Sequence, residues 1–201
     1  MPMSRTGRIL VTSAVGVLAA GLSMVASAPS YAHGYTTSPT SRAEFCANGT
    51  VSDCGAIQYE PQSVEAPKGF PQAGPSDGHI CAGDHADFAE LDDPRNGDWP
   101  TTDVTAGAQY TFQWHLTARH ATEAWDYYIT NDSYDPTKPL TRAELEPEPF
   151  LHVDGDGSQP PADASQTGTL PNKSGRQMIL AVWSVADTGN AFYQCSDVNF
   201  G

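Results

Sequence analysis

Two histidines carry the clearest chemical signal in the chain because of where they lie. His33 directly follows Ser-Tyr-Ala, which has small residues at the positions that a signal peptidase reads, and His120 follows a segment in which polar and apolar residues alternate. As the first residue of a processed chain, His33 would chelate a metal through its ring Nδ1 and its α-amine, whose pKa is about 8. The imidazole of His120 would complete three nitrogen ligands in a T shape. Planar nitrogen donors favour copper over the other divalent first-row metals.

The N-terminal segment predicts the cleavage that this chelate requires. Two arginines precede an apolar run over 9–22, and Ser-Tyr-Ala at 30–32 supplies the small side chains that a signal peptidase reads. A competing cut after Ala28 would leave Pro29 first, which is poorly tolerated. We therefore expect residues 1–32 to be a removed signal peptide and residues 33–201 to form a single secreted, extracellular domain. No later segment approaches the ~18 apolar residues of a membrane span.

Charge limits the class of partner. The chain carries 10 Lys and Arg against 24 Asp and Glu, and the signal segment contains two of the basic residues and no acidic one. The processed chain therefore has eight basic residues and a net charge of −16. This charge argues against nucleic acid and anionic membranes as partners. It is compatible with a neutral, insoluble polysaccharide, although it does not select one.

The four cysteines lie in the processed part, and an even number in an exported protein indicates two disulfides. Three pairings are possible. We favour Cys46–Cys54, which closes a short loop, together with Cys81–Cys195, which ties the middle of the chain to its end. A metal site made from these thiols is less favoured, because no Cys-x-x-Cys pair occurs.

Four segments have the hydrophobic pattern of β-strands. Residues 109–118 alternate between apolar and polar side chains, and 125–129 roughly repeat this pattern. Residues 178–185 are apolar except for Ser184, which indicates a strand buried on both faces, and residues 192–200 form a final strand. Because turn-rich stretches separate these segments, we expect an all-β fold, an immunoglobulin- or fibronectin-III-like β-sandwich.

Two stretches lack such a pattern. The segment from Cys46 to Trp99 is rich in Gly, Pro, Asp and Gln, which predicts a functional loop region with short helices, inserted between early strands. The segment 155–167 is expected to be irregular as well. Its start faintly matches a calcium loop, but Gln159 and Ser165 stand where such a loop needs glycine and glutamate, so calcium is not expected.

Six ordered blocks resemble the bacterial lytic polysaccharide monooxygenases of the chitin-active type, and they extend over nearly all of the processed chain. The blocks are His33-Gly34-Tyr35, Tyr59-Glu60-Pro61-Gln62-Ser63-Val64-Glu65, Lys68-Gly69-Phe70-Pro71-Gln72-Ala73-Gly74-Pro75, Asp77-Gly78-His79-Ile80, Leu116-Thr117-Ala118-Arg119-His120 and Ala191-Phe192-Tyr193-Gln194.

The resemblance implies a role for each matching residue. His33 and His120 match the two histidines of the family's copper site, the histidine brace. Phe192 matches the aromatic residue beside one axial position of the metal, and Ala118 matches the small residue on the opposite side. Glu65 matches an acidic residue that orients oxygen or peroxide. A flat polysaccharide-binding surface is expected from Tyr59, Glu60, Gln62, Ser63 and Thr117, with supporting roles for Asp187 and Asn190.

The activity implied by the resemblance is oxidative cleavage of crystalline chitin, at C1, which leaves aldonic acid ends. It needs one copper ion that alternates between Cu(II) and Cu(I), an external small-molecule or protein electron donor, and dioxygen or hydrogen peroxide as co-substrate. The protein is expected to act as a monomer.

Other functions remain open on the sequence. A non-catalytic chitin-binding protein would use Tyr59 and the same face without copper. A copper carrier could use an N-terminal histidine, but it has no need of the long 46–99 region. A zinc site lacks a third ligand at a recognisable spacing. A glycosidase pair of carboxylates about 5 to 10 Å apart can always be nominated among so many acidic residues. The remaining histidines, His79, His85, His115 and His152, are expected to be structural or on the surface.

Overall fold

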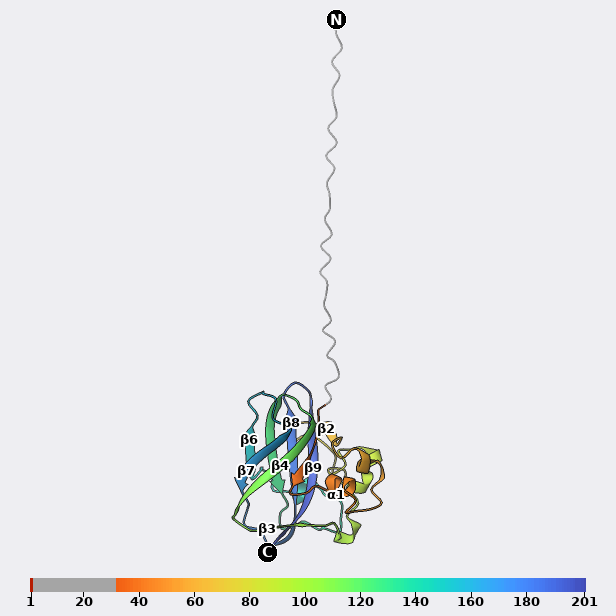
Figure 1. Cartoon of the computed structure of the whole chain (residues 1–201), viewed down its shortest axis with the longest axis vertical. Helices are drawn as coiled ribbons and strands as arrows, with labels where there is room; N and C mark the ends of the chain where they lie inside the picture. Colours follow the sequence, from red (N-terminus) through yellow and green to blue (C-terminus); the bar gives the residue numbers. More distant parts are fainter. Residues whose placement is uncertain (2–31) are drawn as a thin grey trace.

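The computed structural model describes Met1 and residues 32–201, so the predicted signal peptide falls almost entirely outside the described residues. Two β-sheets form the body, and a loop-rich region that carries the α-helix lies beside them (Figure 1). The smaller sheet has the order β1-β4-β7, and the larger has the order β2-β9-β8-β5-β6, with β3 paired parallel to β9. All other strand pairs are antiparallel. The predicted immunoglobulin-like sandwich is confirmed.

The strands are β1 (His33–Ser38), β2 (Glu65–Pro67), β3 (Thr102–Val104), β4 (Gln109–Ala118), β5 (Thr122–Ile129), β6 (Leu151–Asp154), β7 (Asp163–Thr169), β8 (Gly175–Val185) and β9 (Asn190–Phe200). The helices are α1 (Arg42–Ala47) and the 3-10 helices η1 (Gly55–Tyr59), η2 (Ala86–Leu91), η3 (Arg95–Gly97) and η4 (Arg142–Glu144). None of the helices in the described part of the chain is long and apolar enough to cross a membrane.

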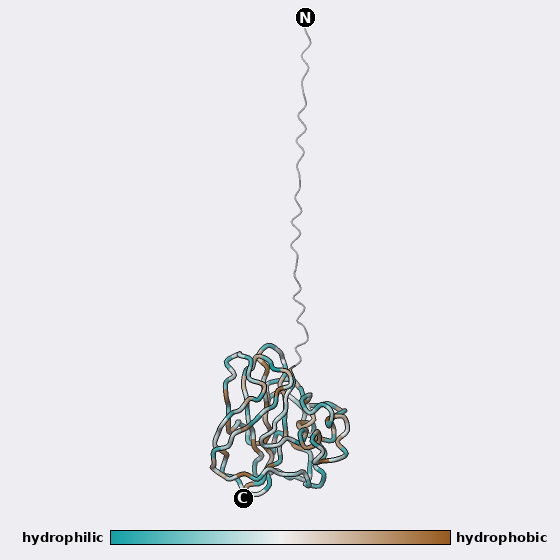
Figure 2. Tube along the Cα trace, in the orientation of Figure 1, coloured by the Kyte–Doolittle hydropathy of each residue, from teal (hydrophilic) through white to brown (hydrophobic). Residues whose placement is uncertain are grey.

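The alternation in β4 builds one half of the sandwich core. Phe112, Trp114 and Leu116 are buried, while the residues between them face outward. They meet aromatic side chains of the larger sheet, where the rings of Trp125 and Trp183 stack 5.3 Å apart. Apolar and polar residues alternate along much of the β-strand body (Figure 2). The alternation of apolar and polar residues along β4 therefore correctly indicates which of its faces is buried.

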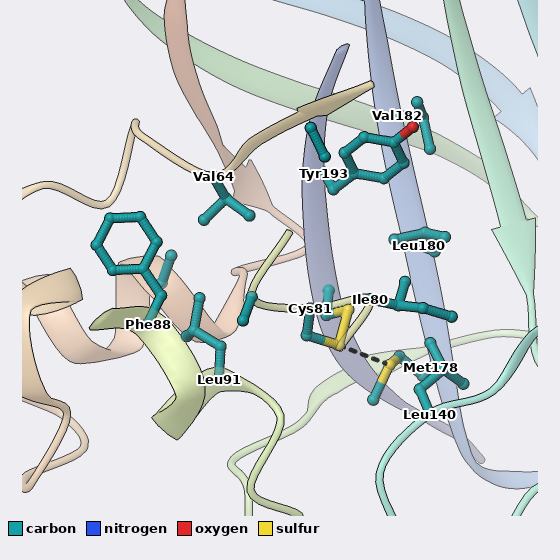
Figure 3. Close-up of a cluster of buried hydrophobic side chains, with 14 of the residues drawn as sticks. Val64, Ile80, Cys81, Phe88, Leu91, Leu140, Met178, Leu180, Val182 and Tyr193 are labelled. Atoms are coloured by element: carbon teal, nitrogen blue, oxygen red, sulfur yellow. Dashed lines mark hydrogen bonds between the residues drawn. A yellow bond between two sulfur atoms is a disulfide. The ribbon is translucent and has the colours of Figure 1, made fainter. Parts of the chain in front are cut away.

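Strand β8 is buried on both faces, as its apolar sequence predicts. Ile179, Ala181 and Trp183 belong to the core between the sheets, whereas Met178 and Leu180 belong to a second core on the other side. Figure 3 shows the second core, with Met178, Leu180 and Val182 facing side chains of the loop-rich region. The larger sheet therefore separates two hydrophobic clusters.

The expectation of an irregular segment over 155–167 is wrong for its second half. Residues 163–169 form β7, which pairs with β4 along its whole length. The inward-facing residues are Ala164, Gln166 and Gly168, and the outward-facing ones are Asp, Ser and Thr. With two small residues and one amide on the buried face, the strand carries almost no hydrophobic alternation, so a pattern search passes over it.

The region from Cys46 to Trp99 is a long insertion of short helices and loops, as predicted. It packs on β8 and β9 through residues such as Val64, Ile80 and Phe88 (Figure 3). Both favoured disulfides are present: Cys46–Cys54 closes a short loop at α1, and Cys81–Cys195 joins the insertion to β9. The insertion is thereby fixed to the central part of the larger sheet.

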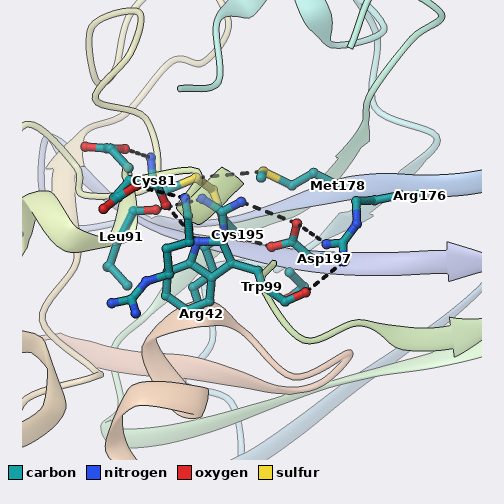
Figure 4. A network of polar contacts seen from close by, with 12 residues as sticks. Arg42, Cys81, Leu91, Trp99, Arg176, Met178, Cys195 and Asp197 are labelled. Carbon is teal, nitrogen blue, oxygen red and sulfur yellow. Dashed lines mark hydrogen bonds and ion pairs between the residues drawn. A yellow bond between two sulfur atoms is a disulfide. The ribbon is translucent and has the colours of Figure 1, made fainter. Parts of the chain in front are cut away.

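A buried polar network also holds the insertion in place. Asp197, on β9, is 2 % exposed and accepts a 2.7 Å hydrogen bond from Nε of Arg42 and a 3.2 Å bond from Nη1 of Arg176 (Figure 4). The guanidinium groups of Arg42 and Arg95 lie 4.8 and 4.7 Å from the ring of Trp99. Since these cations are paired with a carboxylate or an aromatic face, their burial is compensated.

Candidate metal centre and substrate face

The register of β1 and β4 brings the two candidate copper histidines to one end of the sandwich. His33 is the first residue of β1, and its pairing partner is Ala118, the last residue of β4. His120 follows two residues later, outside the strand as predicted, and its carbonyl accepts a 3.3 Å hydrogen bond from the Thr122 hydroxyl. Both histidines are half-buried. The end of the body at which the described chain begins lies opposite the C-terminus (Figure 1).

Phe192 forms an apolar wall beside His33. It lies near the start of β9, is fully buried, and its ring centroid is 6.1 Å from that of His33. Trp183 supports the ring from behind at 5.2 Å. Phe192 has no donor atom, and its close packing against Trp183 fits the role of the aromatic residue that the resemblance implies beside the metal.

Glu65 lies next to this wall. It begins β2, and its pairing partner on β9 is Phe192. Its carboxylate Oε1 accepts a 2.7 Å hydrogen bond from Nδ2 of Asn190. The structure thus brings together Glu65, Phe192 and His33, which are far apart in the sequence. It also gives Asn190 a definite contact in place of an unspecified supporting role.

A second carboxylate faces His120. Oδ2 of Asp187, in the turn between β8 and β9, lies 3.5 Å from Nδ1 of His120. A carboxylate on one ring nitrogen of a histidine fixes the orientation of the ring and leaves the other nitrogen, here Nε2, to face a metal.

All of the predicted substrate-binding residues except Thr117 lie between the last residue of η1 and the start of β2. Tyr59 ends η1 with 82 % of its surface exposed, which is unusual for a large aromatic residue. The half-buried residues Glu60, Gln62 and Ser63 follow it. The carbonyl of Gln62 accepts a 3.1 Å hydrogen bond from the backbone N–H of Gly34, so the segment lies directly beside His33. Thr117 is exposed on the outer face of β4.

Most of the remaining histidines have local partners. Nδ1 of His115 lies 2.8 Å from Asp163, Nδ1 of His152 lies 2.6 Å from Asp126, and Nδ1 of the exposed His79 lies 3.7 Å from Asp92. His85 is different, because its Nε2 lies 2.6 Å from the backbone oxygen of Glu65. The sequence carries no signal of this contact, since a bond to a backbone carbonyl leaves no pattern of residue types.

The donors at the His33 end fit copper. Two imidazoles and the amine of a chain that begins at His33 are all nitrogen donors, which is the set that copper prefers. Within residues 32–201, no group of three or more His, Cys, Asp or Glu side chains is placed to hold a metal ion. A site that takes two side chains and a terminal amine needs no such group, so a histidine brace is compatible with this finding.

The geometry at this end of the sandwich, with two histidines beside a segment that carries an exposed aromatic residue, agrees with the family that the six sequence blocks resemble. The chain belongs to the lytic polysaccharide monooxygenases: the family model described as "Lytic polysaccharide mono-oxygenase, cellulose-degrading" matches residues 33–198. A solved AA10 lytic polysaccharide monooxygenase from Streptomyces lividans is 56% identical, with a TM-score of 0.82 over 84% of this chain and 100% of that chain.

Two further relatives add chemical detail. A Bacillus amyloliquefaciens CBM33 protein, solved in complex with Cu(I), is 41% identical, with a TM-score of 0.76 over 84% of this chain and all of that one. GlcNAc-binding protein A of Shewanella oneidensis is 44% identical over 91% of this chain and 38% of its own length. The chain spans about half or less of the length of the curated relatives that it matches.

Proposed function

We propose that this chain, processed to begin at His33, is a secreted copper-dependent enzyme that cleaves crystalline chitin by oxidation at C1. One observation carries the proposal: His33, His120, Phe192 and Glu65 converge at one end of the sandwich, beside an exposed binding segment. The family match begins at His33, and this supports His33 as the start of the active chain.

The two histidines hold the metal. His33 contributes its α-amine and ring, and His120 contributes Nε2 while Asp187 faces its Nδ1 at 3.5 Å. Bound copper supplies one-electron redox chemistry, with electrons from an external donor and with dioxygen or hydrogen peroxide as co-substrate. The protein would supply the nitrogen ligands and leave the site accessible from the substrate face.

Three other side chains shape the space in which the reaction takes place. Phe192 closes one side of the site, and the small side chain of Ala118, opposite His33 in the β1–β4 register, leaves room near the histidines. The Glu65 carboxylate is held by Asn190, and it would orient hydrogen peroxide by accepting a hydrogen bond from it. A fixed carboxylate does this better than a mobile one, because no reorganisation is needed during the reaction.

Chitin is the proposed substrate rather than cellulose. The family model is described as cellulose-degrading, whereas several relatives are named GlcNAc-binding proteins, and GlcNAc is the unit of chitin. The block of Tyr59 to Glu65 resembles that of the chitin-active type. Tyr59 offers an exposed ring on which a sugar ring stacks, and Glu60, Gln62 and Ser63 offer hydrogen-bonding groups around it.

Mass spectrometry of the soluble products from β-chitin tests the proposal. The copper-loaded protein that begins at His33 should release oligosaccharides with aldonic acid ends only when ascorbate is present. Two controls are matched to the site: His120→Ala removes one imidazole, and a protein that retains Ala32 keeps both imidazoles but blocks the amine of His33. Both should be inactive. With copper bound and peroxide supplied, absence of oxidised products from β-chitin would refute the chitin assignment, and cellulose is then assayed.

A further inference from the structure

Glu65 lies on the terminal strand of the larger sheet, where its backbone carbonyl has no partner strand in the described part of the chain. Strand β2 has three residues and is the last strand of the larger sheet, so only one of its sides pairs with β9. On that side the carbonyl of Val64 accepts a 3.0 Å hydrogen bond from the N–H of Tyr193. The carbonyl of Glu65, one residue later, points the other way. An edge carbonyl of this kind has no partner strand to hold it.

His85 occupies that position. Its Nε2 lies 2.6 Å from the Glu65 oxygen, and because a carbonyl only accepts, Nε2 must carry the proton. The neutral Nε2–H tautomer and the imidazolium ion both meet this requirement, so the contact does not depend on the charge of the ring. The His85 ring packs beside Phe88, a buried residue of η2, and the two ring centroids are 5.2 Å apart.

The loop that presents His85 is itself tied to the sheet. The Cys81–Cys195 disulfide joins it to β9, and Oδ1 of Asp92 accepts hydrogen bonds of 2.9 and 3.1 Å from the N–H groups of Cys81 and Ala82. At Gly83, which has a φ of +65°, a Cβ atom would lie 3.1 Å from Val64 and 3.3 Å from the Glu65 oxygen. Glycine therefore allows the loop to lie directly against β2.

We propose that His85 is a positioning residue for the Glu65 carboxylate, and this rests on the proposed function. His85 holds the backbone of Glu65 from the open edge, while Asn190 holds its carboxylate from β9. Loss of the His85 bond removes the support of the Glu65 carbonyl while β2 stays paired with β9, and a small rotation of this peptide then shifts the carboxylate from the position at which it meets the co-substrate. Displacements of this kind lower the rate without changing the substrate face.

Three substitutions separate hydrogen bonding from packing. His85→Leu removes the donor, His85→Gln replaces it with an amide N–H of similar reach, and His85→Asn supplies the same amide one methylene too short. We expect His85→Leu and His85→Asn to lower the initial rate of peroxide-driven product release by about 3- to 10-fold, the value of one hydrogen bond. His85→Gln should restore most of the rate. Binding of the metal-free variants to chitin should stay within twofold of the parent.

A second readout does not depend on activity. In metal-free protein with ¹³C-labelled glutamate, the side-chain carboxyl signal of Glu65 is assigned by its absence from Glu65→Gln. It should shift in His85→Leu and His85→Asn and return in His85→Gln. An unshifted signal in His85→Leu, or an equal shift in all three variants, would refute the proposal. If the parent itself released no oxidised product, the proposed function would fail, while the carboxyl signal would still report whether His85 positions Glu65.

Discussion

Asp92 gives the stability of this protein a defined dependence on pH. The residue follows η2, its side chain is 8 % exposed, and only its Oδ1 accepts hydrogen bonds from the loop. Oδ2 has no hydrogen-bond partner among the described residues, and Nδ1 of His79 lies 3.7 Å from it. Burial raises the pKa of Asp92 from 3.8 to about 6, although the loop N–H groups, His79 and Arg42 act in the opposite direction.

The sign of the effect follows from this pKa. A carboxyl group with a raised pKa in the folded state binds its proton more tightly there than in the unfolded chain. Its contribution to stability is therefore complete below pH 4 and is lost as the pH rises through 6. A shift of about two pH units corresponds to about 3 kcal/mol of free energy of unfolding. Asp92→Asn keeps the Oδ1 acceptor and removes the charge, so it should stabilise the metal-free protein by about 3 kcal/mol at pH 7.5.

Urea unfolding of metal-free parent and variant at pH 4 and pH 7.5 measures this difference. The two proteins should be about equally stable at pH 4, and at pH 7.5 the variant should have the larger free energy of unfolding. In a thermal melt at pH 7.5, the melting temperature of the variant should be higher by about 6–12 °C. The matched control is Asp87→Asn, which removes an exposed charge from η2 and should leave the pH dependence unchanged. A stability difference between Asp92→Asn and the parent that is the same at both pH values would refute the reasoning.

Three further predictions concern the cross-link, the apolar wall and the substrate face. Replacing Cys81 and Cys195 by serine opens a loop with a sequence separation of 114 and should lower the free energy of unfolding in urea by about 5 kcal/mol. Opening Cys46–Cys54, with a separation of 8, should cost about half as much. Equal losses would contradict this. Phe192→Ala should lower the free energy of unfolding by about 3–5 kcal/mol and Phe192→Leu by about 1 kcal/mol, because alanine leaves a cavity next to Trp183. A small loss for the alanine variant would mean that the packing around Phe192 is not rigid. Tyr59→Ala should weaken chitin binding about 3- to 10-fold in a depletion assay while Tyr59→Phe retains it, and unchanged binding by the alanine variant would remove Tyr59 from the substrate face.

The strands were predictable wherever hydrophobic side chains marked the buried face. The predicted range 109–118 coincides with β4, and 178–185 lies within β8, because both strands contribute large apolar residues to a core. Strand β7 was missed, since its inward residues include Ala164 and Gly168. Its position is set by pairing with β4, a long-range contact that its own sequence does not encode.

In the candidate site, too, the residue types were predictable from the sequence, whereas the backbone contacts between distant strands were not. The two candidate copper histidines and Glu65 were singled out because their residue types and the surrounding blocks resemble a known pattern. The register that places His33 opposite Ala118, and Glu65 opposite Phe192, came only with the structure. His85 could not be predicted, because it acts on a backbone atom and any donor of the right reach would do the same.

The burial of the disulfides has a chemical consequence for a protein whose proposed activity needs an external electron donor. The four cysteines are at most 4 % exposed, each covered by the core that it helps to build. Thiols break a disulfide only by direct attack on sulfur, which requires access. A reductant in the surrounding solution would therefore reduce copper held by the half-buried histidines, while Cys81–Cys195 stays intact beneath the insertion. The reducing conditions that the proposed activity requires would leave both disulfides in place.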